Sequence, residues 1–101
     1  MRFVLENFSG GNIVMLMRKV GYFLLGEYRE NQELNFVNPI GINNYPRFHI
    51  YLRVRLVTKE LVFNLHLDQK KPVYKKASDH GAEYEGEAIK REAERISQIL
   101  Q

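Results

Sequence analysis

The chain has 101 residues, a length typical of one domain, and we expect residues 1–101 to form a single compact unit. It contains no cysteine, which excludes disulfides and thiolate chemistry, and it has no run of the ~18 apolar residues that a membrane helix requires. The first residues also lack the apolar stretch of a signal peptide, so the sequence predicts a cytoplasmic protein without a membrane partner.

The charge of the chain is unevenly distributed around a net value of +3. Residues 47–76 hold eight basic and two acidic side chains, whereas residues 77–101 hold three basic and six acidic ones. A basic middle segment is able to attract phosphate groups, although lysine and arginine more often serve only to keep a protein face solvated.

The first 40 residues predict a weak strand at residues 2–8, then a helix and a hairpin. Apolar residues at i, i+3, i+4 and i+7 indicate one face of the helix, namely Ile13, Leu16, Met17 and Val20. The β-branched residues there also suit a strand, but Asn12 as N-cap and Gly21 after the last turn favour the helix. Residues 22–28 and 33–40 then read as two strands joined by a polar turn.

Two longer strands follow a loop at residues 41–46. Residues 47–55 and 60–68 both alternate apolar and polar side chains, the pattern of a strand with one buried face. In an antiparallel pair, the apolar face of one strand must align with the apolar face of the other. A register with Arg55 opposite Glu60 matches the apolar residues of both strands along their whole length.

The same register defines a polar group on the other face of the pair. It sets His49 opposite His66 and Tyr51 opposite Asn64, with Cβ atoms about 4.5–5.5 Å apart. A slip by two residues would instead set Tyr51 against His66 and His49 against Asp68. In both registers four polar residues form one compact group, the strand-pair group: His49, Tyr51, His66 and Asp68.

A basic loop at residues 69–81 leads to a second helix, predicted from about Glu83, with a regular start nearer Glu87 because Gly86 weakens the first turn. The element order is therefore β-α-β-β-β-β-α, with the first strand only weakly indicated. We expect an α+β fold, a mostly antiparallel sheet of four to five strands with two helices on one face. The opposite face stays uncovered and carries the strand-pair group.

The strand-pair group has the residue types of a small hydrolase. A histidine between a tyrosine and an aspartate is able to act as a general base, with the carboxylate orienting its ring. The candidate catalytic residues, for hydrolysis of phosphodiesters above all, are His49, His66, Asp68 and Tyr51. The simpler interpretation is that both histidines make ordinary cross-strand contacts on a solvated face.

The histidines are also candidate ligands of a divalent metal such as Zn²⁺. His49 and His66 would supply two nitrogens, and His80 would supply a third if its loop folds back. The spacing between the two strand histidines matches no recognised ligand motif, so the pattern alone does not specify a metal.

Binding of a nucleic acid or another phosphate-bearing ligand is the function that we expect first. Cations interleaved with aromatic residues suit phosphate contacts and base stacking. They occur on the polar sheet face and in the loop after it, and the candidate ligand-binding residues are Arg47, Arg53, Lys70, Lys71, Tyr74, Lys75 and Lys76. An exposed solvated loop would have the same composition.

Homodimerisation without catalysis is the third expected function. The acidic residues 78–87 follow the basic residues 70–76, so the two segments could pair between two copies of the chain. An open sheet edge would also invite strand addition by a partner. The expected functions therefore rank as ligand binding, hydrolysis and homodimerisation.

Overall fold

The computed structural model describes residues 1–28, 32–69 and 79–101 of the chain, with side chains for residues 1–26, 32–69 and 86–101. Its elements in chain order are β1 (Arg2–Leu5), α1 (Ile13–Lys19), β2 (Phe23–Tyr28), β3 (Glu33–Pro39), β4 (Arg47–Arg55), β5 (Glu60–Asp68) and α2 (Asp79–Leu100). The predicted α+β class and element order are confirmed, and the weakly indicated first strand is present.

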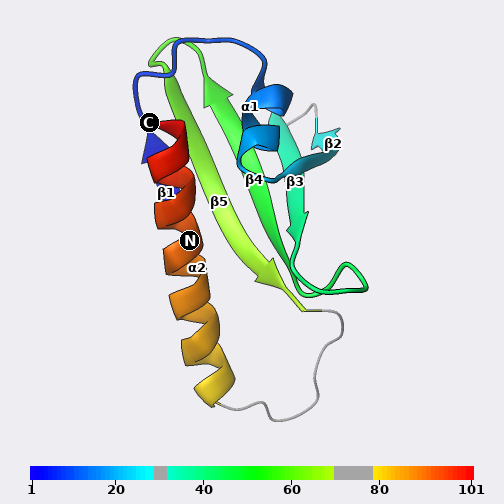
Figure 1. Cartoon of the computed structure of the whole chain (residues 1–101). Helices are drawn as coiled ribbons and strands as arrows, with labels where there is room; N and C mark the ends of the chain where they lie inside the picture. Colours follow the sequence, from blue (N-terminus) through cyan, green and yellow to red (C-terminus); the bar gives the residue numbers. More distant parts are fainter. Residues whose placement is uncertain (29–31, 70–78) are drawn as a thin grey trace.

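The strands form one antiparallel sheet in the order β1-β5-β4-β3-β2. Both helices lie on the same side of this sheet, with α2 running along β5 and β1 (Figure 1). In the described part of the chain, no element covers the other side. The prediction of two helices on one face is therefore confirmed. Neither described helix combines the length and the apolar character that crossing a membrane requires.

The register between β4 and β5 is the one that pairs Arg55 with Glu60. It places His49 opposite His66 and Tyr51 opposite Asn64, which confirms the predicted pairing and excludes the two-residue slip. The alternation of both strands accounts for this result, because only a register that keeps like faces together buries the apolar residues of both.

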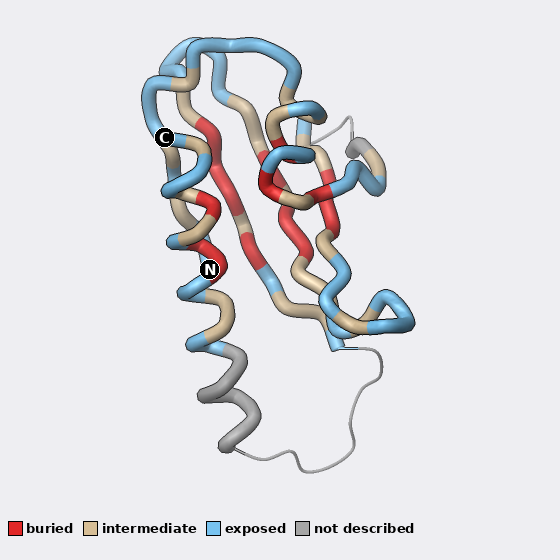
Figure 2. The backbone as a smooth tube through the Cα atoms, viewed as in Figure 1, coloured by how far each residue is buried: buried red, intermediate tan, exposed pale blue. Residues whose placement is uncertain are grey.

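The hydrophobic core lies between the sheet and the two helices, where the buried parts of the backbone tube face one another (Figure 2). Its fully buried members come from α1 and the residues after it, from three strands and from α2, namely Met17, Val20, Tyr22, Phe36, Ile50, Leu52, Phe63, Leu65 and Ile96. The predicted apolar stripe of the first helix supplies Met17 and Val20, and α2 supplies Ile96, so the helices are held against the sheet by burial of apolar surface.

The ends of α1 follow the predicted caps. The Asn12 side chain accepts a hydrogen bond of 3.1 Å from the backbone N–H of Met15. After Val20, Gly21 adopts a φ of 98°, in the left-handed region that glycine tolerates best. The preference for a helix over a strand at residues 13–20 is therefore confirmed.

Helix α2 starts at Asp79, so the predicted starts near Glu83 and Glu87 were wrong. Gly86 does not delay the helix, because a single glycine costs only about 1 kcal/mol in a helix interior and α2 has 22 residues. An acidic residue at the first position also favours an early start, since a negative charge stabilises the N-terminal end of the helix dipole.

Candidate functional site

The uncovered face of the sheet carries polar side chains from four strands. Side chains alternate between the two faces along each strand, so pairing across the sheet gathers every second residue on this side. The rows that cross it are Pro39, Arg47 and Asp68, then Val37, His49 and His66, then Asn35, Tyr51, Asn64 and Arg2, then Glu33, Arg53, Val62 and Val4. This surface, called the open face below, contains the strand-pair group.

His49 is held by hydrogen bonds at both ring nitrogens. Its Nδ1 lies 3.0 Å from Oδ2 of Asp68, and its Nε2 lies 2.9 Å from Oδ1 of Asn35. His49 is only 8% exposed and Asn35 is 3% exposed. Because both nitrogens are occupied and the ring is buried, His49 fits a structural role better than proton transfer or metal ligation.

Asp68 connects His49 to Arg47. The same Oδ2 atom accepts a hydrogen bond of 3.3 Å from Nε of Arg47. The guanidinium of Arg47 also lies over the ring of Tyr45, at 4.8 Å from its centroid. The charge of Arg47 is therefore already paired, which weakens the case for this residue as a phosphate ligand.

Tyr51 lies between the two histidines. Its ring stacks on His49 with 4.5 Å between centroids, and it meets the edge of His66 at 5.6 Å. The predicted strand-pair group therefore exists as one contiguous set of side chains. Within it His49 is buried and His66 is exposed, so the two histidines differ in access to solvent and to a ligand.

The environment of His66 disfavours its charged form. Partial burial of the ring lowers the pKa of His66 below 6.5, and the positive charges of the amino terminus and of His49 act in the same direction. Asp68 opposes this shift. This shift favours the neutral ring of His66, the form in which an imidazole is able to accept a proton or a hydrogen bond.

The structure does not assemble a metal site from the residues that it describes. Among them, no three His, Asp or Glu side chains lie close enough together to hold an ion. His80 belongs to the first turn of α2, but its side chain is outside the described residues, so its predicted role as a third ligand stays a prediction.

A second feature of the open face is a polar pocket of about 240 Å³, called the arginine pocket below. It is lined by Arg2, Glu33, Tyr51, Arg53, Arg55, Val62 and Asn64. Arg53 donates to Glu33 at 3.3 Å, and Arg55 lies 3.5 Å from Glu60 outside the pocket lining. The lining itself holds three arginines and one glutamate, so it carries a positive surplus.

One donor in the arginine pocket lacks an acceptor. Nε of Arg53 is buried from solvent and has no hydrogen-bond partner among the described residues. A buried N–H without a partner costs about 1–3 kcal/mol, and such groups in native proteins call for an explanation. The Arg53 side chain as a whole is 43% exposed, so its other atoms, and not this nitrogen, are what the pocket offers to an anion.

Sequence reasoning placed Arg53 and Tyr51 on this face but missed three of their neighbours. Asn35 and Glu33 come from β3, and Arg2 comes from β1. The alternation of residues 33–37 could have revealed the first two, because the polar residues there share one face. The predicted ligand residues of the loop, Lys70, Lys71, Tyr74, Lys75 and Lys76, lie outside the described residues.

Comparisons with known proteins do not add a functional assignment. The chain matches no protein-family model, no curated protein and no solved structure. The chemistry of the open face therefore rests on its geometry and charge alone.

Proposed function

We propose that the open face binds a phosphate-bearing ligand, a nucleic acid first of all, with a phosphate group in the arginine pocket. The observation that carries the proposal is the polar pocket lined by three arginines and one glutamate, which gives its surface a positive surplus. A guanidinium presents its donors in a fixed fork that matches the oxygens of phosphate. A phosphate group in the pocket would pair with the guanidinium groups that line it.

The aromatic side chains beside the pocket support a nucleotide rather than a free phosphate ion. Tyr51 lines the arginine pocket and also contacts both histidines. Exposed His66 extends this row of rings toward solvent. Proteins that bind single-stranded nucleic acids combine such rings, on which bases stack, with a positive groove that follows the backbone.

Two further parts of this proposal rest on the sequence. The loop lysines from Lys70 to Lys76 would continue the positive surface along a bound strand, because the loop follows directly after β5. The cytoplasmic location expected from the absence of cysteine and of a signal-peptide pattern likewise remains a prediction.

Fluorescence anisotropy with labelled single-stranded RNA and DNA tests the proposal. Binding should weaken steeply between about 50 and 200 mM salt, because displaced counterions dominate phosphate contacts. Arg53→Gln should weaken binding by about tenfold or more, and Arg53→Lys should restore only part of it, since lysine keeps the charge but lacks the fork. Arg91→Gln is the matched control, because Arg91 is exposed on α2, on the helix side of the sheet.

Competition by inorganic phosphate and by mononucleotides identifies the source of the phosphate group. Displacement by mononucleotides but not by inorganic phosphate at the same concentration would point to recognition of the base as well. Equal displacement of the labelled nucleic acid by both competitors would show that the site recognises only the phosphate group. Absence of binding, or binding equal in Arg53→Gln and Arg91→Gln, would overturn the proposal.

The hydrolase alternative now depends on His66. Its neutral, exposed ring beside Tyr51 is able to act as a base, whereas the ring nitrogens of His49 are both engaged. If the chain cleaves RNA or a small phosphodiester substrate, His66→Ala should abolish the activity. The circular dichroism spectrum of this variant should show that it remains folded. No cleavage by the wild-type chain, with or without Zn²⁺, would eliminate this alternative.

A further inference from the structure

β1 is an edge strand, and only its inner side is paired within the described residues. Met1 and Leu65 exchange both backbone hydrogen bonds, each at 2.8 Å. Hydrogen-bonded pairs alternate along an antiparallel ladder, so Phe3 and Phe63 form the next such pair. The backbone N–H and C=O groups of Arg2 and Val4 therefore point away from β5, toward the free edge.

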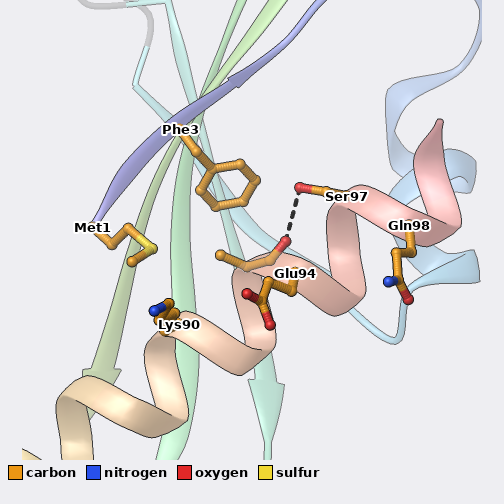
Figure 3. Close-up of a pocket in the computed structure, with 7 residues that line it drawn as sticks. Met1, Phe3, Lys90, Glu94, Ser97 and Gln98 are labelled. Atoms are coloured by element: carbon orange, nitrogen blue, oxygen red, sulfur yellow. Dashed lines mark hydrogen bonds between the residues drawn. The ribbon is translucent and has the colours of Figure 1, made fainter.

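A groove of about 390 Å³ runs between this edge and α2. Phe3 projects from β1 toward α2, and Lys90, Ala93 and Glu94 line the opposite wall (Figure 3). Phe3 already stacks on Phe63, with 4.7 Å between centroids and an interplanar angle of 4°. The groove is thus a largely apolar channel with a charged rim, next to backbone donors and acceptors that no described residue pairs, a combination that suits an extended polypeptide strand.

We propose that this edge is the interface between two copies of the chain, joined β1 to β1 in antiparallel orientation about a two-fold axis at Phe3. In this register Arg2 exchanges both outward backbone hydrogen bonds with the partner's Val4, and Val4 does so with the partner's Arg2. Phe3 then faces the partner's Phe3 as a non-hydrogen-bonded pair, the arrangement that brings side chains closest. The stacked Phe63 and Phe3 rings continue into the second copy, and the two sheets become one.

The charges on α2 make a second copy a better occupant than an unrelated peptide. Lys90 and Glu94 are four residues apart, so they lie on the same side of the helix, and both are exposed at the groove. A two-fold axis sets the two α2 helices antiparallel, which brings each Lys90 toward the partner's Glu94. An isologous interface, in which both copies use the same surface, requires such a self-complementary pair of opposite charges.

The opposite edge of the sheet is less suited to pairing. The ladder between β2 and β3 is interrupted by an irregularity between Leu24 and Gly26. A bulge at an edge twists the strand and disrupts regular addition of another strand. The free edge of β1 has no such interruption, since its four residues pair with β5 in continuous register.

Sedimentation velocity over about 1 µM to 1 mM tests the proposal, with a dimer fraction that rises with concentration expected for the wild type. Val4→Pro removes an outward N–H without touching the bonds between β1 and β5, and should weaken the dimer by about tenfold or more. Val4→Thr keeps that N–H and should dimerise like the wild type. A wild type that stays monomeric throughout, or equal dimerisation of the two variants, would overturn the proposal and leave the edge to another partner.

A charge exchange on α2 provides a test that does not alter β1. Glu94→Lys should weaken the dimer, because Lys90 would face a like charge, and adding Lys90→Glu to it should restore dimerisation. Failure of the double variant to recover would contradict the proposed antiparallel helix pairing. None of the substitutions replaces a residue that lines the arginine pocket, so the side chains that would contact a ligand there are kept.

Discussion

Tyr22 donates a hydrogen bond of 2.6 Å to Oε2 of Glu92, which lies 70 positions further along the chain. Tyr22 is fully buried and Glu92 is 7% exposed. Arg95 binds both oxygens of Glu92, at 2.9 and 2.7 Å, and it also donates to the carbonyl oxygen of Val20 at 2.7 Å. These polar contacts join α2 to the end of α1 on the core side of the sheet.

Replacing Glu92 should destabilise the protein. Glu92→Gln removes the charge that accepts from both Tyr22 and Arg95, and we expect the free energy of unfolding to fall by about 2 kcal/mol. Glu87→Gln, on an exposed position of the same helix, should change it by less than about 0.5 kcal/mol. Urea unfolding followed by circular dichroism measures both, and equal stability of the two variants would contradict a structural role for Glu92.

The stability of the protein should fall in strong alkali because of Tyr22. Burial, and then the hydrogen bond to Glu92, raise the pKa of Tyr22 far above 10, so the folded state keeps a proton that the unfolded chain loses near pH 10. Above that pH the folded state binds more protons than the unfolded state, so the free energy of unfolding declines by up to about 1.4 kcal/mol per pH unit. Urea unfolding at about pH 9 and pH 11 should show a smaller decline in Tyr22→Phe than in the wild type.

Asp68 should contribute to stability through its two partners. Asp68→Asn removes a charge that binds His49 and Arg47, and we expect a loss of about 1–2 kcal/mol in the free energy of unfolding. Glu60→Gln is the control, because its pair with Arg55 is exposed and long at 3.5 Å and such pairs contribute little. Chemical unfolding of both variants at neutral pH compares them directly, and a larger loss in the control would refute the argument.

His66 should titrate below the usual range of histidine. Partial burial, then the amino terminus and His49, lower its pKa, and we expect its NMR titration midpoint to lie below 6.5. The unfolded chain therefore takes up a proton at a higher pH than the folded state, so stability declines as the pH falls through 6.5 and levels off below the folded pKa. His66→Gln should lack this decline. A titration midpoint of His66 at or above 6.5 would contradict the environment described for its ring.

The pairing of β4 and β5 was predictable from the sequence because apolar and polar residues alternate along both strands, with Val62 as an apolar residue on the polar face. A slip by one residue would expose Phe63 and Leu65 to water, and the burial of such residues contributes about 1.5–3 kcal/mol each. The contiguity of His49, Tyr51 and His66 follows from the same pairing, so this half of the candidate site was predictable with it.

The other half of the site depends on pairings that no local pattern specifies. Arg2 reaches the arginine pocket only because β1 pairs with β5, about 60 residues later in the sequence. Asn35 reads as a surface residue, yet it is buried because β3 lies beside β4 and brings it to His49. Tyr22 was predicted to begin a strand, but after the turn at Gly21 its ring enters the core and β2 begins at Phe23.

The hydrogen bond between Arg95 and the carbonyl oxygen of Val20 couples the unfolding of the two helices. Helix α1 has seven residues, far fewer than the roughly 12–15 that an isolated helix needs in water. The carbonyl oxygen of its C-cap residue, Val20, is bound by a side chain 75 positions away, so we expect α1 to lose order when α2 detaches. Amide hydrogen exchange should therefore report one opening event for both helices, with equal protection at Val20 and in the last turns of α2.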